Sequence, residues 1–177
     1  MTGIGLEQGF VKLVPYNPEW KSMYDDESRR LQSILRIYLI DIQHIGSTAI
    51  PGIFSKPIID IAIAIRNLNE MDQIIDIMEK NGYLYRGEMG IPDRHLFVKS
   101  TGAIRTHHIH IMLKIHIQWE THQLFRDYLN HHTHIANQYN QLKMKLKDQF
   151  EHDRAGYTEG KSQFIQSVIE KAKKEKN

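Results

Sequence analysis

The sequence predicts an α+β (mixed α/β) fold, in which one mixed β-sheet is flanked by helices and followed by a C-terminal helical layer. Ile58–Ile65 alternates with the two-residue period of a β-strand, and Ile104–Ile115 is a second, longer strand-like segment. From Gln118 onward the apolar residues recur with the period of an α-helix. The 177 residues, 41% of them hydrophobic, are enough to bury a core without disulfides or a structural metal.

Composition narrows the class of protein further. The chain has no cysteine, which excludes a disulfide framework, thiolate zinc sites and cysteine nucleophiles, and fits a cytoplasmic location. It has no long apolar run and no basic-then-apolar leader, so we expect neither a membrane partner nor a signal peptide. The net charge of +2 gives no reason to expect nucleic acid as a partner. We expect a monomer or homodimer.

The domain boundaries follow from the ends of the chain. We expect residues 1–10 to form a loose N-terminal tail, residues 11–172 a single domain and residues 173–177 a solvated basic tail. Val11–Val14 is a candidate edge strand. The first helix is predicted to begin at Asn17-Pro18-Glu19, where asparagine caps, proline takes the first helical position and glutamate meets the positive end of the dipole. It should run to about Arg36.

A strand, a loop and a second strand then form the centre of the sequence. Leu39–Ile45 is predicted as the first core strand, and Ser47–Lys56 as the loop after it. In Ile58–Ile65 the alternate isoleucines form one face, which helices must cover. The opposite face carries small residues and one carboxylate, Asp60. The two faces of this strand therefore differ sharply in polarity.

The remaining strands follow a second helix. That helix is capped by Asn67 and stopped by Asn81-Gly82. The strands and their hairpin turn are expected at Tyr83–Arg86, Arg94–Lys99, Ile104–Ile115 and, for the turn, Ser100-Thr101-Gly102. In the long strand His108, His110 and Met112 share one face.

Three helices are predicted to complete the chain. We expect a loop between the first two, formed by the histidine-rich segment that contains His131, His132 and His134. The alternating lysines of Leu142–Lys147 are expected on a solvated face of the second of these helices.

The loop after the first core strand is a candidate phosphate site. A glycine there, Gly46, lets the backbone approach a ligand, and successive backbone N–H groups can hold phosphate oxygens. Ser47 and Thr48 add hydroxyl groups, and Lys56 adds a positive charge. The alternative is an ordinary tight connection, in which Gly46 and Gly52 only provide positive φ angles.

Asp60 is the candidate catalytic and metal-binding residue. A carboxylate within an apolar strand is costly unless it is paired, protonated or metal-bound, although a structural hydrogen-bonding role also stays open. The position of a second acid, two residues on, is Ala62. His108 and His110 replace that acid if their strand lies beside Asp60 with matching faces, and they then suit a softer metal than magnesium. Otherwise they are two solvated histidines.

Several segments resemble the GrpB family, within the nucleotidyltransferase superfamily. They are VPYNPEW, HIGSTAIPGIFSKPIIDI and THHIHIM, and the resemblance continues to the Tyr157…Lys161 segment. It implies a nucleotidyltransferase-like mixed sheet, whose Gly-Ser turn binds nucleotide phosphates and whose acid pair binds Mg²⁺. Gly46 and Ser47 match the turn and Asp60 the first acid. Ala62 departs from the second acid, and Gln43 stands where many members of the family carry glutamate.

These observations give three hypotheses. The first is transfer of a nucleotidyl or phosphoryl group from an NTP, or another phosphorylated small molecule, to an unknown acceptor. Asp60 would be catalytic and, with His108 and His110, would hold Mg, Mn or Zn. The phosphate-binding residues would be Gly46, Ser47, Thr48, Lys56, Arg94 and Lys161. The alternatives are a non-catalytic nucleotide- or phosphate-binding relative and a His/Asp metal-dependent hydrolase.

Overall fold

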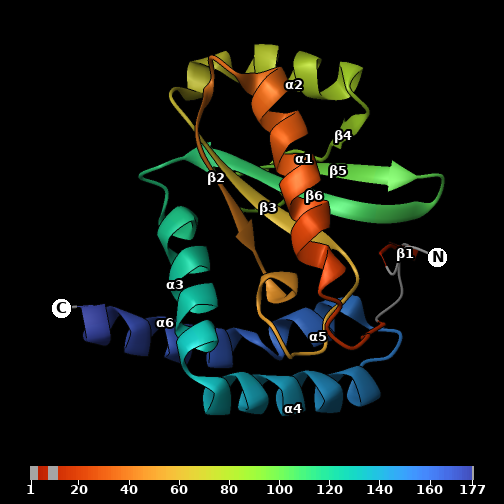
Figure 1. Cartoon of the computed structure of the whole chain (residues 1–177), viewed down its shortest axis with the longest axis vertical. Coiled ribbons are helices and arrows are strands. Elements are labelled where there is room, and N and C mark those ends of the chain that lie inside the picture. The colour runs from red at the N-terminus through yellow and green to blue at the C-terminus, as the bar shows by residue number, and fades with distance from the viewer. Residues whose placement is uncertain (1–3, 8–11, 177) are drawn as a thin grey trace.

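A computed structural model describes residues 4–7 and 12–176 of the chain (Figure 1). The chain forms α-helices, β-strands and two short 3₁₀ helical turns, which are labelled η1 and η2. The elements are β1 (Leu6–Glu7), α1 (Glu19–Leu35), β2 (Leu39–Ile45), η1 (Ser47–Ala49), β3 (Ile59–Ile65), η2 (Leu68–Glu70), α2 (Met71–Lys80), β4 (Tyr83–Tyr85), β5 (His95–Thr101), β6 (Ile104–Leu113), α3 (Ile117–His131), α4 (Thr133–Gln149), α5 (Arg154–Glu159) and α6 (Ser162–Lys176).

The sheet is mixed, as predicted. Its strand order is β2-β3-β6-β5-β4, and β1 pairs with β6 off this path. β3 and β6 are parallel, whereas the other pairs are antiparallel. Leu39–Ile45, predicted as the first core strand, forms the edge strand β2. β3 and β6 lie side by side inside the sheet. Between them in the sequence come α2, β4 and β5, after which the chain returns and β6 pairs with β3.

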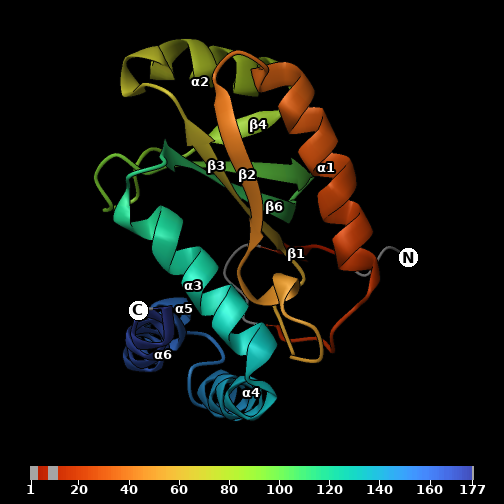
Figure 2. The ribbon, with the colours of Figure 1, turned by 60° about the vertical axis from the view of Figure 1, so that its left-hand side comes forward.

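The isoleucine face of β3 is covered by helices, as its alternation predicted. Ile59, Ile61, Ile63 and Ile65 are buried with Trp20 and other apolar residues of α1 and α2. Figure 2 shows α1 on one side of the sheet and α3 on the other. Helix α1 also begins as expected, since the Glu19 backbone N–H donates to the Asn17 side chain at 2.9 Å.

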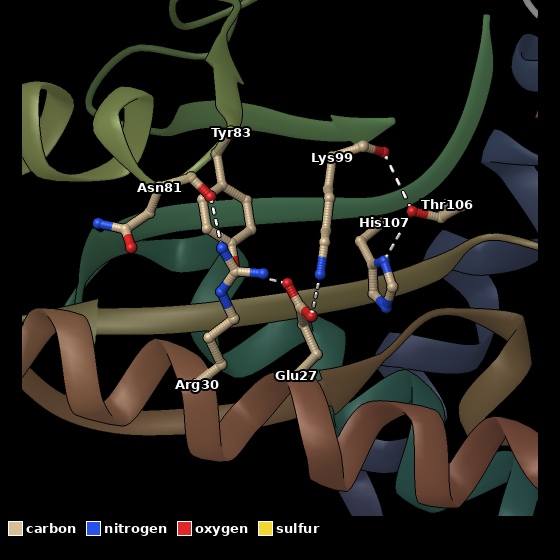
Figure 3. A network of polar contacts seen from close by, with 7 residues as sticks. All are labelled: Glu27, Arg30, Asn81, Tyr83, Lys99, Thr106 and His107. Atoms are coloured by element: carbon tan, nitrogen blue, oxygen red, sulfur yellow. Dashed lines mark hydrogen bonds and ion pairs between the residues drawn. The ribbon is translucent and has the colours of Figure 1, made fainter. Parts of the chain in front are cut away.

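A buried polar network also joins α1 to this face (Figure 3). The Tyr83 hydroxyl and the Lys99 ammonium each donate to the Glu27 carboxylate at 2.5 Å. Burial by itself opposes ionisation of Glu27, but these two hydrogen bonds outweigh it and lower its pKa. The network thus ties one helix to two neighbouring strands.

The opposite face is packed partly by the C-terminal helices. Trp119 of α3 lies against Ala62, Ala64 and Met112 of the sheet. Helices α3, α4 and α6 form a second core together with the loop after β2, through Ile50 and Ile53. The predicted C-terminal helical layer is therefore present, and it holds the loop that follows β2.

Four local expectations differ from the structure. The N-terminal tail contains β1, where Leu6 is buried and pairs with β6, while residues 8–11, including Val11, lie outside the described part. Residues 173–176 are solvated but continue α6. Residues 154–159 form α5, a helix that the sequence did not predict. β5 extends to Thr101, so the hairpin turns at residues 102–103.

The histidine-rich segment differs as well. Of the three histidines expected in a loop, His131 ends α3 and His134 belongs to α4, so only His132 lies between the helices. His132 is bonded to both helices, because its backbone N–H donates to the carbonyl of Tyr128 in α3 and its carbonyl accepts from the backbone N–H of Ala136 in α4. No helix within residues 4–7 and 12–176 is long and apolar enough to cross a membrane.

Candidate functional site

The pairing of β3 with β6 brings the predicted acid and histidines together. Asp60 is the register partner of His108, and Ala62 that of His110. Asp60 Oδ1 lies 3.2 Å from His108 Nδ1 and 3.8 Å from His110 Nε2. Burial opposes ionisation of Asp60, but the two histidines outweigh it and hold its pKa well below the ordinary value. The condition on which the sequence-based hypothesis depended, a neighbouring strand with matching faces, is therefore met.

The glycine loop lies directly against this carboxylate. Gly46 has φ +71° and ψ −172°, a conformation that is essentially restricted to glycine. A Cβ atom on Gly46 would lie 2.7 Å from Asp60 Oδ2. Glycine is therefore required twice, once for the backbone and once for the space that Asp60 occupies.

A cavity of about 360 Å³ opens at this point, beside Asp60 and Gly46. It lies where β1, β3 and β6 meet α3 and α5. Its lining contains a single carboxylate and four lysine or arginine side chains. The lining residues are Leu6, Ile45, Gly46, Lys56, Ile58, Asp60, Arg105, His108, His110, His122, Arg154, Thr158 and Lys161.

Two of the cations lie close to the same aromatic ring. The Nζ atoms of Lys56 and Lys161 lie 4.6 Å and 4.4 Å from the ring centroid of Tyr157. Burial, followed by repulsion from Lys161, lowers the pKa of Lys56 to about 7. Burial likewise lowers the pKa of Lys161 to about 8, although the charge of Asp60 opposes that shift. An anion in the cavity would stabilise the charged form of both lysines and so raise their pKa values again.

The protonation of His110 follows from its neighbour. Arg94 Nη1 lies 3.0 Å from His110 Nδ1, and a guanidinium can only donate. His110 Nδ1 is therefore the acceptor, so the ring proton is on Nε2, the nitrogen that faces Asp60. A histidine that binds metal through Nε2 normally carries its proton on Nδ1 and donates it to an acceptor. Arg94 occupies the position where that acceptor would stand.

The donor set consequently does not fit the expected divalent metal. Mg²⁺ takes oxygen ligands, and Asp60 is the single carboxylate lining a cavity with four Lys or Arg side chains. Zn or Mn would use the histidines, but the Arg94 contact sets His110 in the other tautomer. Within the described ranges, no group of three or more His, Cys, Asp or Glu side chains is placed to hold a metal ion. The metal that the sequence led us to expect at Asp60, His108 and His110 is therefore not carried into the function proposed below.

Three of the predicted phosphate ligands do not line the cavity. Ser47 lies behind it, with Oγ 3.5 Å from Lys143 Nζ. Thr48 is buried and its hydroxyl contacts His44 Nε2 at 3.0 Å, beside a separate hollow that Arg126 also lines. Arg94 is buried behind His110. Gly46, Lys56 and Lys161, in contrast, do line the cavity.

Lys143 corrects a second expectation. The sequence placed this lysine on a solvated helix face, but its side chain is buried and donates to the carbonyl oxygen of Phe54. Burial lowers the pKa of Lys143 to about 7. The lysine therefore links α4 to both ends of the loop after β2, since Ser47 and Phe54 both contact it. Its alternating neighbour Lys145 is exposed, as expected.

Sequence reasoning also missed three cavity residues. His122 of α3 has a buried Nε2 atom without a hydrogen-bond partner among the described residues, and burial lowers its pKa to about 4. Arg105 and Arg154 supply two of the four positive charges. Arg105 gave no signal, because it stands in the polar first half of its strand, beside Thr106 and His107. His122 and Arg154 lie on helices without a pattern that points to the cavity.

Fold and cavity together define an α+β protein whose mixed sheet carries a cationic cavity next to an Asp–His contact. The chain belongs to the GrpB family, since the family described as "GrpB protein" matches residues 10–171. A crystal structure of the conserved protein GrpB from Enterococcus faecalis is similar, with a TM-score of 0.85 and 32% identity over 93% of this chain and 98% of that one.

Curated relatives support the same membership. UPF0157 protein YqkA of Bacillus subtilis is 40% identical over 93% of this chain, which spans about half (48%) of YqkA. Glutamate-rich protein GrpB of Alkalihalophilus pseudofirmus is 32% identical over 94% of this chain and 98% of that protein. A shorter match, 33% identical over 41% of this chain, covers 19% of a dephospho-CoA kinase of Mycolicibacterium paratuberculosis.

Proposed function

We propose that this protein binds a nucleotide, or another phosphorylated small molecule, in the cavity beside Gly46 and Asp60. The observation that carries the proposal is the charge of the lining, where Lys56, Lys161 and two arginines face one carboxylate. Phosphate groups complement such a set, and hydrogen bonds between ionised partners are about twice as strong as neutral ones. The family assignment, by itself, would not identify a ligand.

The lowered lysine pKa values support the same ligand. Lys56 and Lys161 lose part of their proton affinity because both are buried, and Lys56 is also repelled by Lys161. A bound phosphate would stabilise both ammonium groups at once, so the cavity is better matched to a charged ligand than to solvent. A volume of about 360 Å³ is also within the usual range of small-molecule sites, roughly 300–1,000 Å³.

The partial match to a dephospho-CoA kinase is in keeping with a nucleotide-related role. The match covers a small share of that enzyme, so its own activity is not transferred to this chain. It supports the choice of nucleotides as the first ligands to test.

Calorimetric titration tests the proposal. Wild-type protein should bind tripolyphosphate or an NTP, and Lys56→Met and Lys161→Met should each weaken binding about 10-fold or more, which corresponds to loss of one charge-assisted hydrogen bond. Lys145→Met is the matched control, because Lys145 is exposed on α4 away from the cavity lining. Absence of binding, or equal losses in all three variants, would contradict the proposal.

The Asp60–His108 contact favours group transfer as a second candidate function. Asp60 accepts the Nδ1 proton of His108 at 3.2 Å, which leaves Nε2 as the nitrogen that can take a proton from an acceptor hydroxyl. The hydroxyl oxygen would form the new bond to phosphorus as the bond to the leaving phosphate breaks. The cavity cations would stabilise the charge on the leaving group.

Turnover of labelled NTP separates this candidate from binding alone. Water replaces the unknown acceptor in the assay, so wild-type protein should release phosphate or pyrophosphate slowly. His108→Asn and Asp60→Asn should abolish that release while leaving NTP binding measurable. Binding without turnover in the wild type would leave only the binding function.

A further inference from the structure

A groove of about 460 Å³ lies next to the cavity, on the same face of the sheet. It lies over one face of β4, β5 and β6 and shares three residues with the cavity: Arg105, His108 and Arg154. The lining residues are Gly82, Leu84, Arg86, Met89, Leu96, Val98, Ser100, Gly102, Ala103, Arg105, His108 and Arg154. The cavity and the groove therefore adjoin, with these three residues at the boundary between them.

The floor of the groove is an apolar row aligned with the candidate site. Leu84 pairs with Val98, and Val98 pairs with His108, so their side chains lie in one row across three strands. Leu96 occupies the same position opposite His110. Trp119 of α3 covers the part of this face that β3 forms. The part formed by the β4–β5 hairpin is more open, and Leu84 there is 55% exposed.

The rim of the groove is basic. Arg86, Arg105 and Arg154 line it, and among the described residues no acidic side chain does. Arg105 Nε is also buried without a hydrogen-bond partner in the described part of the chain. A ligand that passes from the cavity into the groove thus meets cations at the junction and apolar side chains beyond it.

We infer that the groove holds the nucleoside part of a nucleotide whose phosphates lie in the cationic cavity. This inference rests on the function proposed above. Because the cavity and the groove adjoin at Arg105, His108 and Arg154, a ligand whose phosphates lie in the cavity is within reach of the groove. The apolar row of Leu84, Leu96 and Val98 gives a planar base a surface to pack on, and the arginines at the junction match the phosphates nearest the sugar.

Titrations with tripolyphosphate and with each of the four common ribonucleoside triphosphates test the inference. At least one nucleotide should bind the wild type about 10-fold more tightly than tripolyphosphate, because tripolyphosphate cannot use the groove. Leu84→Gln should reduce that preference several-fold and leave tripolyphosphate affinity within about twofold. Leu84→Trp should increase the preference, since aromatic side chains stack on nucleobases.

Ile37→Gln is the control, because Ile37 is an exposed aliphatic residue that lines neither space. Equal affinity of the wild type for tripolyphosphate and all four nucleotides would overturn the inference and leave the proposed phosphate site intact. Insensitivity of the preference to both Leu84 variants would also overturn it. If neither tripolyphosphate nor any nucleotide binds, the proposed function fails together with the inference.

Discussion

Replacement of Gly46 by alanine probes the contact on which the candidate site is built. The backbone at Gly46, with φ +71° and ψ −172°, costs a non-glycine residue on the order of 1–3 kcal/mol. The new Cβ would also lie 2.7 Å from Asp60 Oδ2, where ordinary contacts begin at 3.4 Å. Asp60 would have to move by several tenths of an ångström and weaken its hydrogen bond with His108, which costs roughly 1–2 kcal/mol more.

Urea unfolding should therefore show Gly46→Ala to be destabilised by about 3–4 kcal/mol, or about 10 °C in Tm. Gly52→Ala is the matched control: φ is +80° there, but no atom lies within 4 Å of the added Cβ, so about 1 kcal/mol is expected. In an Asp60→Ala background the cost of Gly46→Ala should fall, because the carboxylate oxygen is gone. Equal destabilisation by Gly46→Ala and Gly52→Ala would show that the contact with Asp60 adds nothing to the cost.

Buried ionisable groups give three predictions about pH. Glu27 has a lowered pKa, and burial lowers the pKa of His107 to about 4. In acid the unfolded chain therefore binds more protons than the folded chain, and the free energy of unfolding should drop as pH falls from 6.5 toward 4. Urea unfolding measures this drop, and a flat profile would contradict it. The pKa of Lys143, about 7 when folded against 10.5, should make stability rise across that interval, and Lys143→Met should flatten the rise in the same assay; an unchanged slope would show that the buried lysine keeps its proton. Tripolyphosphate binding should weaken as pH rises from about 7 to about 9, because free Lys56 and Lys161 lose protons that they would keep beside the bound anion. Calorimetry in buffers of different ionisation enthalpy should detect proton uptake on binding, and Lys56→Arg should reduce that uptake. Binding without proton uptake would contradict the assignment of these two lysines.

The sheet could be predicted because its strands carry strong local signals. Alternation in β3 identified both the strand and the face that α1 and α2 cover. The edge position of β2 could not be read from its sequence, since strand order depends on which segments pair after the chain has crossed back. The reason is different for α5, because a six-residue helix is too short to show an apolar period.

The candidate site divides along the same line. Strand periodicity placed the two β6 histidines on one face, but whether they meet Asp60 was left open, because it depends on the parallel register of β3 and β6. Lys143 was misplaced because its partner Phe54 is 89 residues away and lies on a loop whose path no local pattern reveals. The Arg94–His110 contact depends likewise on tertiary packing, and it alters what His110 can bind.

A crystal structure with a non-hydrolysable NTP and Mn²⁺ tests the central claim most directly. We expect the phosphate groups to lie in the cavity within hydrogen-bonding distance of Lys56 and Lys161, with the nucleoside directed toward Leu84. We also expect that no Mn²⁺ ion joins Asp60 to His110. Phosphate density outside this cavity, or a metal ion coordinated by both of those residues, would contradict the claim.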